Sequence, residues 1–490
     1  MTGQPTPDAA DAAEPQRAQS ADKLVIPLLL VSAFIVILNE TIMAVALPAL
    51  NRDLGIPVST GQWLTSAFML VMAVVIPVTG YLLQRFHLRQ VFITAMSLFT
   101  LGTLVCFLAP GFALLLLGRI VQASGTAIMM PLLMTTVLNM VAAERRGRTM
   151  GNISIVISVA PAVGPTLSGL VLNVLDWRWL FGLVLPIAVV GLLLGALFIR
   201  NVTEPRAASI DVPSVLVSAP AFGGLVYGFS SLGESGGSTA PVPPWSAIAV
   251  GAVALVVFVA RQLRLQRNDR ALLDLRVFRS RQFSVSIGLV AGSFLALFGT
   301  LILLPVYMQY VLGLDTLATG LVMLPGGLVM GLLAPFVGRL YDRIGARPLI
   351  IPGAALVSVV LWTMVVVFDT DTAPVVVVGT HVVMSVGLGL MFTPLLTGAL
   401  GSLDQKLYSH GSAVVGTIQQ VAGAAGTATF TTVMSATAAG LMAGGTGEVA
   451  AQAAGINTAF TIGAVVSVLA FAATFFVRGS TADTEQAPAH

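Results

Sequence analysis

Long apolar runs separated by short polar loops occupy almost the whole chain. A helix needs about 20 apolar residues to cross the hydrocarbon core of a membrane, and the runs predict fourteen such helices. Their expected ranges are 24–50, 61–83, 90–109, 112–141, 149–174, 179–200, 212–232, 245–265, 283–311, 317–340, 348–368, 374–400, 411–442 and 457–477. The predicted fold class is therefore an all-α polytopic membrane protein with 14 transmembrane helices.

An internal repeat divides these helices into two sets. The stretch Gly80–Arg89 is echoed by Gly338–Arg347, and further matches flank both copies at an offset of about 260 residues. A duplicated half of six spans is typical of secondary transporters, whose binding site lies between the halves. We therefore expect a six-helix bundle over 24–200 and a second over 283–477. The spans at 212–232 and 245–265 have no counterpart and belong to a linker over 201–282. The polar tails, 1–23 and 478–490, are expected to be disordered and cytoplasmic.

Composition agrees with a membrane protein and excludes several other classes. Hydrophobic residues make up 56% of the chain and charged residues only 9%, whereas a soluble domain has about 25% charged residues. The single cysteine, Cys106, and four scattered histidines offer no metal cluster. No phosphate-binding Gly-Lys-Ser/Thr signature, no nucleophile–base set and no soluble domain is present. An enzyme, an ATP-driven pump or a membrane receptor is therefore not expected, and neither is binding to nucleic acid.

The basic residues predict the orientation. Apart from Arg52, Arg119 and Arg178, every Lys and Arg falls in a tail or loop on one side of the fourteen predicted spans. The positive-inside rule places that side in the cytoplasm. The chain is thus predicted to be a multi-pass protein of a bacterial inner membrane with both termini cytoplasmic. The basic segment from Arg261 to Arg281 is interpreted as an ordinary cytoplasmic loop with some contact to membrane lipids.

Two charged residues fall deep inside predicted spans, away from the cytoplasmic ends where most other arginines lie. Glu40 lies in the first span, beyond its middle, and Arg119 lies near the outer end of the fourth span. Charges within the bilayer are costly, so they are functional candidates by default. A buried carboxylate can bind and release a proton, and an arginine that stays charged can bias that equilibrium. The alternative is a static ion pair that serves only helix packing.

With these residues the chain resembles the major facilitator superfamily, and within it the 14-span drug:proton antiporters. Gly80–Arg89 and Gly338–Arg347 are similar to the cytoplasmic loop motif of each half. Arg119 and Gln122 match a fourth-span motif used in proton coupling, and Asn39, Glu40 and Thr41 fall in the first-span motif. The resemblance implies gating roles for a set of loop and fifth-span residues: Gly80, Arg85, Arg89, Gly164, Pro165, Gly169, Gly338, Asp342, Arg343 and Arg347.

The chain also departs from the family pattern. Gln84 and His87 stand where the loop motif usually has aspartate and glycine, so the amino-terminal gate is expected to be weaker. The first-span aspartate is replaced by Asn39, and an acid follows one residue later at Glu40, a rotation of about 100° on a helix. This Asn-Glu-Thr arrangement resembles that of lincomycin-efflux transporters.

The resemblance implies proton-coupled export of amphipathic drugs or antibiotics by rocking alternating access. Its partners would be small amphipathic molecules, protons and membrane lipids. The proton gradient would be the energy source, with no cofactor. Exporters of one specific metabolite and proton-coupled nutrient importers remain alternatives. Aromatic, Met and amide side chains form adaptable binding surfaces, and they predict this cavity wall: Asn39, Trp63, Phe68, Met69, Gln122, Met129, Met130, Tyr307, Gln309, Tyr310, Met391, Phe392, Gln419 and Gln420.

Overall fold

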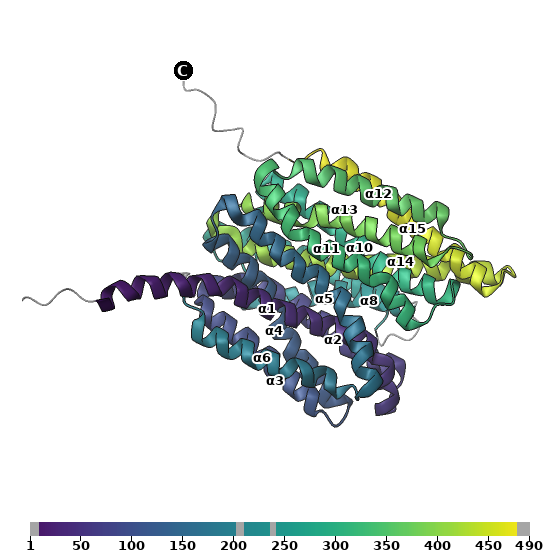
Figure 1. Cartoon of the computed structure of the whole chain (residues 1–490), viewed down its shortest axis with the longest axis horizontal. Helices are drawn as coiled ribbons and strands as arrows, with labels where there is room; N and C mark the ends of the chain where they lie inside the picture. The colour runs from purple at the N-terminus through teal and green to yellow at the C-terminus, as the bar shows by residue number, and fades with distance from the viewer. Residues whose placement is uncertain (1–8, 202–209, 236–241, 478–490) are drawn as a thin grey trace, which may run out of the picture.

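Helices make up nearly all of the regular structure in the computed structural model, which describes residues 9–201, 210–235 and 242–477. One bundle contains α1 (Ala9–Leu54), α2 (Val58–Arg85), α3 (Leu88–Leu108), α4 (Phe112–Met140), α5 (Arg146–Val174) and α6 (Arg178–Phe198). The other contains α10 (Arg281–Val306), α11 (Thr316–Ile344), α12 (Arg347–Val367), α13 (Pro374–Gly401), α14 (Tyr408–Ala443) and α15 (Glu448–Thr474). The prediction of a helical fold is confirmed, and Figure 1 shows the two sets of helices side by side.

In the described chain, twelve helices are long and apolar enough to cross a membrane, or thirteen if one bent pair counts as a single span. The bent pair joins Ala143–Pro161 to Thr166–Val174 at an angle of 40°, where the sequence places two prolines. Proline removes a helical hydrogen bond and favours such a bend. The long helix α14 is not among the twelve because Gly, Ala, Ser and Thr dilute its hydropathy. Fourteen spans therefore remain a prediction.

The amino-terminal tail is a correction to the sequence analysis. Helix α1 begins at Ala9, so residues 9–23, which we expected to be disordered, are helical. Four alanines at 9, 10, 12 and 13 explain this, because alanine has the highest helix propensity. The predicted tail over 478–490 lies outside the described residues.

Glycines allow the helices within each bundle to approach closely. A Cβ on Gly102 of α3 would lie 2.4 Å from the backbone nitrogen of Gln122 on α4. In the second bundle, a Cβ on Gly426 of α14 would lie 2.6 Å from the carbonyl oxygen of Leu295 on α10. Small residues at such positions let the two backbones touch. The van der Waals contacts that result stabilise helix association in lipid, where no hydrophobic effect drives it. These contacts fix α4 and α14, which carry predicted site residues.

The linker forms a helical hairpin between the bundles in sequence. It consists of α7 (Val212–Ser218), a π-helical turn at Ala219–Gly223, α8 (Gly224–Ser235) and α9 (Pro244–Leu265). Helix α8 packs against α14 and α2, and Tyr227 stacks on Trp63 of α2 with ring centroids 5.8 Å apart. The hairpin therefore touches one helix of each bundle along the seam between α2 and α14.

A cluster of polar contacts ties the two arms of this hairpin together. Arg261 donates to both oxygens of Asp211 at 2.8 Å, and Gln262 donates to the hydroxyl of Ser214 at 2.8 Å. The hydrogen bond from Arg261 is the main reason why the pKa of Asp211 falls to about 2. The pair is therefore ionised throughout the neutral range and holds α9 to the start of α7.

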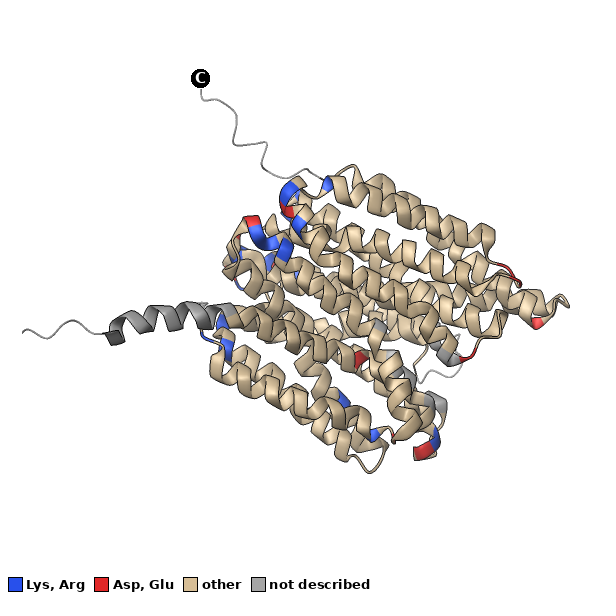
Figure 2. Ribbon diagram, viewed as in Figure 1, with Lys and Arg blue, Asp and Glu red and all other residues tan. Residues whose placement is uncertain are grey.

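Charged residues gather at the two ends of the helices, as Figure 2 shows. One end carries the helix termini with Arg85, Arg89, Arg148, Arg343 and Arg347, and we call it the arginine-rich end. The opposite end, which we call the far end, carries Asp315, Asp369 and Asp371 together with the pair of Arg178 and Asp53. This separation is the pattern from which the orientation was predicted.

Candidate functional site

Arg119 is the centre of a buried polar network in the first bundle. Its side chain is 1% exposed, and its Nη1 donates to the side-chain oxygen of Gln122 at 2.7 Å and to that of Asn39 at 3.4 Å. Its Nε donates to the backbone oxygen of Leu64 at 3.4 Å. These partners lie on α4, α1 and α2, so one guanidinium connects three helices. Arginine can do this because its planar fork carries five donors in fixed directions.

The network continues behind Gln122. The amide of Gln122 donates to the hydroxyl of Thr103 on α3 at 2.8 Å, and that hydroxyl donates to the carbonyl oxygen of Phe99 at 2.7 Å. Phe68 of α2 closes the other side, with its ring centroid 4.0 Å from the guanidinium carbon of Arg119. A cation held against an aromatic face and fully hydrogen-bonded amides is stable in a dry interior. The arrangement fixes the guanidinium in one position.

Glu40 lies next to this network without closing it. The carboxylate interacts electrostatically with Arg119, but within the described residues the two form no ion pair; Arg119 is hydrogen-bonded to Asn39 instead. Asn39 is 2% exposed, whereas Glu40 is only partly buried. The two neighbours point in directions about 100° apart on the helix. Asn39 thus occupies the position facing Arg119, and Glu40 keeps a carboxylate that no arginine neutralises by direct contact.

Helices α1 and α5 touch directly beside Glu40. The hydroxyl of Thr41 donates to the carbonyl oxygen of Leu38 at 2.9 Å and reaches that of Ala160 at 3.4 Å. A Cβ on Gly164 would lie only 2.2 Å from the Thr41 hydroxyl. Gly164 is therefore required for this close approach, which gives a physical reason for glycine at one of the predicted gating positions. At Gly169, by contrast, an added Cβ would meet nothing within 4 Å.

At the arginine-rich end, an acid of the second bundle caps a helix of the first. Asp342 on α11 accepts hydrogen bonds from the backbone nitrogens of Gly147 at 2.8 Å and Arg148 at 2.9 Å, at the start of α5. A carboxylate at a helix amino terminus satisfies free N–H groups and interacts favourably with the helix dipole. Gly338 lies so close to Gly147 that a Cβ there would be 2.2 Å from its carbonyl oxygen.

The pseudo-equivalent contact in the first bundle uses neutral groups. Gln84 on α2 donates to the hydroxyl of Ser409 at 3.0 Å and lies 2.8 Å from Nε2 of His410, at the start of α14. Gly80 faces the same histidine, with its virtual Cβ 3.1 Å from Nδ1. An amide lacks the charge that Asp342 brings to a helix terminus. This contact therefore agrees with the expected weaker amino-terminal gate, whose strength stays a prediction.

Further hydrogen bonds seal the bundles together in the same half of the molecule. Ser154 on α5 contacts Thr393 on α13 at 2.7 Å, and Thr135 on α4 donates to Ser412 on α14 at 3.1 Å. Deeper in the seam, the amide of Gln420 lies 3.8 Å from the sulfur of Met72. Across the described residues, the hydrogen bonds between the bundles run from the arginine-rich end to this depth. The structure is thus closed toward the arginine-rich end.

The four arginines predicted to act in gating, Arg85, Arg89, Arg343 and Arg347, are exposed and form no ion pair among the described residues. At the arginine-rich end they can instead contribute to the orientation of the chain in the membrane, as the positive-inside rule describes. Of Pro165 only the backbone is described, and it belongs to α5.

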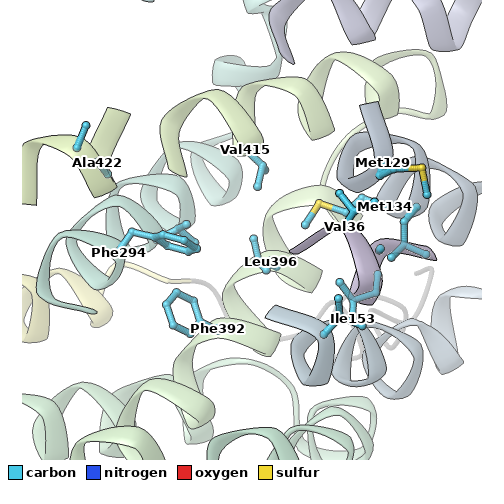
Figure 3. Close-up of a cluster of buried hydrophobic side chains, with 14 of the residues drawn as sticks. Val36, Met129, Met134, Ile153, Phe294, Phe392, Leu396, Val415 and Ala422 are labelled. Carbon is cyan, nitrogen blue, oxygen red and sulfur yellow. The ribbon is translucent and has the colours of Figure 1, made fainter. Parts of the chain in front are cut away.

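The structure brings together only part of the predicted cavity wall. Asn39, Phe68 and Gln122 surround Arg119, and Gln420 lies on the seam. Figure 3 shows Met129 beside Val36 in the first bundle, with Phe392 facing Phe294 in the second and Leu396 between the two groups. The rings of Phe392 and Phe294 are 5.0 Å apart. Met69, Met130 and Gln419 are partly buried, and the amide nitrogen of Gln419 is buried without a hydrogen-bond partner.

Other residues of the predicted cavity wall contact parts of the molecule away from Arg119 and the seam. Trp63 stacks on Tyr227 of the linker hairpin. Tyr307 is buried at the far end, where its hydroxyl donates to the carbonyl oxygen of Asp369 at 2.6 Å and its ring stacks on Phe368. Met391 packs so closely on α12 that a Cβ on Gly353 would lie 2.9 Å from it. Gln309 and Tyr310 are exposed at the far end.

Several contact residues were not identified from the sequence. Thr103 and the carbonyl oxygen of Leu64 complete the shell of Arg119, and Ser409 and His410 receive Gln84. The only indication of Ser409 and His410 in the sequence was that Gln84 replaces the aspartate of the family's loop motif, because a changed residue in a gate implies a changed partner. Thr103 and Leu64 gave no signal, since hydroxyls and backbone oxygens are common in every span.

Comparison with known proteins defines the class. The chain belongs to the Major Facilitator Superfamily, whose sequence model matches residues 29–427. The protein is therefore a membrane transporter and not an enzyme. Solved structures share the fold: a human organic anion transporter, MFSD10, has a TM-score of 0.64 at 16% identity and covers 93% of this chain and 99% of its own. The proton:xylose symporter XylE has a TM-score of 0.63 at 15% identity, and the match covers 94% of this chain and 97% of that one.

Closer relatives point to resistance proteins. The chain is 41% identical over 392 residues to the lincomycin resistance protein LmrB of Listeria monocytogenes, which covers 80% of this chain and 82% of the relative. It is 40% identical over 467 residues to the uncharacterised MFS-type transporter YcnB of Bacillus subtilis, covering 95% and 97%. A multidrug resistance protein B homolog of Mycobacterium tuberculosis is 29% identical, covering 78% and 71%. The predicted resemblance to the drug-efflux branch of the superfamily is confirmed.

Proposed function

We propose that this transporter exports amphipathic drugs or antibiotics in exchange for protons. The observation that carries the proposal is the geometry of Glu40, a partly buried carboxylate beside an arginine that donates its hydrogen bonds to Asn39, Gln122 and Leu64 instead. Because Arg119 does not pair with it directly, Glu40 can change its protonation state without breaking an ion pair. The relatives whose names refer to lincomycin and multidrug resistance support the class of substrate.

The closed seam supports a cycle of alternating access. In the proposed cycle the far end of this state opens to the outside, and Glu40 takes up a proton from there after the drug has left. Protonation removes a charge from the first bundle and lowers the cost of closing it. Separation of Asp342 from α5 and of Gln84 from α14 then opens the arginine-rich end, where the proton leaves and the next drug molecule binds.

The direct test uses purified protein in liposomes with an imposed pH gradient. We expect a fluorescent amphipathic cation, or radiolabelled lincomycin, to accumulate against its gradient when the drug-receiving side is acidic. We also expect protons to move in the opposite direction, measured with a trapped pH-sensitive dye. Substrate movement that is indifferent to the gradient would contradict proton coupling, and accumulation in the direction of proton flow would make the protein a symporter.

We further propose that the arginine-rich end is cytoplasmic, and α13 offers a matched test. Thr370 and Asp404 are exposed at opposite ends of this helix, and the single native cysteine is buried. In intact cells, a membrane-impermeant thiol reagent should label Thr370→Cys and spare Asp404→Cys until the cells are opened. The reverse pattern would show that the orientation is inverted.

Removing the charge that caps α5 should loosen the seam. Asp342→Asn places an amide next to the N–H groups of Gly147 and Arg148, so a charge-assisted contact worth about 1 kcal/mol or more is lost. Ser154 is buried at the seam, and Ser154→Cys should then react several-fold faster with a thiol reagent from the arginine-rich side. Asp371→Asn at the far end is the control. Equal reactivity in both backgrounds would mean that Asp342 does not hold the seam.

A further inference from the structure

A groove of about 410 Å³ runs along the outer surface of the second bundle, between α10 and α15. Its floor includes Gly288 and Gly292, where an added Cβ would meet nothing within 4 Å. Its walls include Val466, Leu469 and Phe476, of which the last two are 67% and 60% exposed. Large apolar side chains with this exposure face the hydrocarbon of the membrane in a transporter. The groove is thus an apolar channel that is open to lipid.

One cation stands at the mouth of this channel. Arg281 begins α10 at the arginine-rich end and lines the groove, with its guanidinium carbon 6.0 Å from the ring centroid of Phe476. No carboxylate of the described chain forms an ion pair with it. The other polar lining residue, Ser284, already donates its hydroxyl to the carbonyl oxygen of Phe278 at 2.9 Å. The groove therefore combines a long apolar channel with a single positive charge at one end.

The length of the groove matches one leaflet of a bilayer. From Arg281 to Gly292 the helix rises by about 16 Å, and half of a hydrocarbon core is about 15 Å. A ligand that fills the groove would therefore have its charge at the membrane surface and an apolar tail ending near the midplane. An acyl chain of a phospholipid has this form, and an arginine recognises its phosphate through paired hydrogen bonds.

We propose that this groove binds one anionic phospholipid, with its phosphate on Arg281 and one acyl chain between α10 and α15. A free phosphate would leave the apolar channel unfilled, and an uncharged alkyl chain would leave the arginine unpaired. A zwitterionic lipid would bring its own cation close to Arg281. The proposal depends on this end of the helices lying at a membrane surface and does not depend on the direction of transport or on proton coupling.

Binding should be measured on the purified full-length protein by native mass spectrometry. Dioleoyl phosphatidylglycerol and dioleoyl phosphatidylcholine are titrated separately. The wild type should bind one phosphatidylglycerol more tightly than any phosphatidylcholine. Arg281→Gln should weaken phosphatidylglycerol binding about tenfold and abolish the preference, because charge-assisted hydrogen bonds are lost. Gly288→Leu/Gly292→Leu should fill the groove and abolish the tight binding of either lipid.

Two substitutions serve as matched controls. Arg339→Gln removes an arginine that lies over Phe336 in the same way, at 5.8 Å, but outside the groove. Gly379→Leu fills another open glycine position, on α13. Neither should change the bound lipid. The groove variants should fold, because leucine has a higher helix propensity than glycine and its side chain would enter open space. Each variant is used only if its melting temperature without lipid equals that of the wild type. If the double variant fails this criterion, the single variant Gly288→Leu replaces it.

Three results would overturn the proposal. Unchanged phosphatidylglycerol binding by the groove-filled protein would place the lipid elsewhere. Unchanged preference in Arg281→Gln would remove the headgroup contact. Displacement of the bound lipid by an equal concentration of inorganic phosphate would make Arg281 a site for free anions. Because no readout involves drug movement, failure here would leave the transport proposal intact, and a failed transport assay would leave this one intact.

Discussion

Glu40→Gln should reduce drug accumulation driven by a pH gradient to the level of empty liposomes. Glutamine has nearly the shape of glutamate but cannot exchange a proton, so the drug can no longer be coupled to proton flow. The first bundle should stay intact, since the polar network of Arg119 is built on Asn39, Gln122 and Leu64 and not on Glu40. The measurement is uptake in proteoliposomes, normalised to the amount of inserted protein.

A second readout separates coupling from folding in this variant. Exchange of labelled for unlabelled substrate needs no net proton movement, so Glu40→Gln should keep it while losing gradient-driven uptake. Glu448→Gln is the matched control, because Glu448 is exposed at the start of α15. Wild-type accumulation by Glu40→Gln would show that another group carries the proton. Loss of both exchange and uptake would assign Glu40 to substrate binding or to structure.

Arg119→Lys should slow transport by at least about tenfold although the charge is kept. The guanidinium donates to Gln122, Asn39 and Leu64 from two nitrogens, and its central carbon lies over the ring of Phe68. A lysine ammonium is a compact donor on a flexible chain and cannot reach all three helices together. Each buried charge-assisted hydrogen bond that is lost costs about 1.5–3 kcal/mol, and 1.4 kcal/mol corresponds to a factor of ten.

The control for this substitution is Arg339→Lys, at an exposed arginine that also lies over a phenylalanine. It should transport at the wild-type rate. A second comparison, Gln122→Leu, should release Arg119 from its shortest hydrogen bond and shift the pH dependence of uptake, which a purely structural role would not do. If Arg119→Lys transports normally, Arg119 contributes only a positive field, and the three-helix connection is not needed for the cycle.

Much of the architecture follows from the sequence because the membrane is a simple solvent. Hydrocarbon requires long apolar helices whose backbone groups bond internally, so the runs of apolar residues predict where helices lie. The duplication predicts two bundles, since two copies of one pattern fold alike. A charge in the bilayer is costly, so Glu40 and Arg119 stand out against an apolar background without any knowledge of their neighbours.

The tail at 9–23 shows a limit of composition as a guide. Its polar residues predicted disorder, but its alanines form the first turns of α1. Once a helix has started, each added residue needs only one more hydrogen bond, so a polar segment joined to a long apolar helix can continue it. Sequence patterns therefore locate the apolar core of a helix more securely than its ends.

The side-chain partners depend on the tertiary structure. Apolar runs in a membrane carry no strong periodicity, so they do not indicate which face of each helix meets lipid, a neighbouring helix or the seam between the bundles. The rotation of α1 places Asn39, and not Glu40, against Arg119, and that of α2 turns Trp63 toward Tyr227.

The gates show the same division. The internal repeat alone predicts that Asp342 and Gln84 hold corresponding places in the two halves. The partners of these two side chains depend on how the helices pack. Because α11 packs on α5, Asp342 caps the start of α5, and because α2 packs on α14, the amide of Gln84 contacts Ser409 and His410. The physical reason is that hydropathy is a property of each segment alone, whereas a hydrogen bond between bundles depends on the relative position of two helices far apart in the chain.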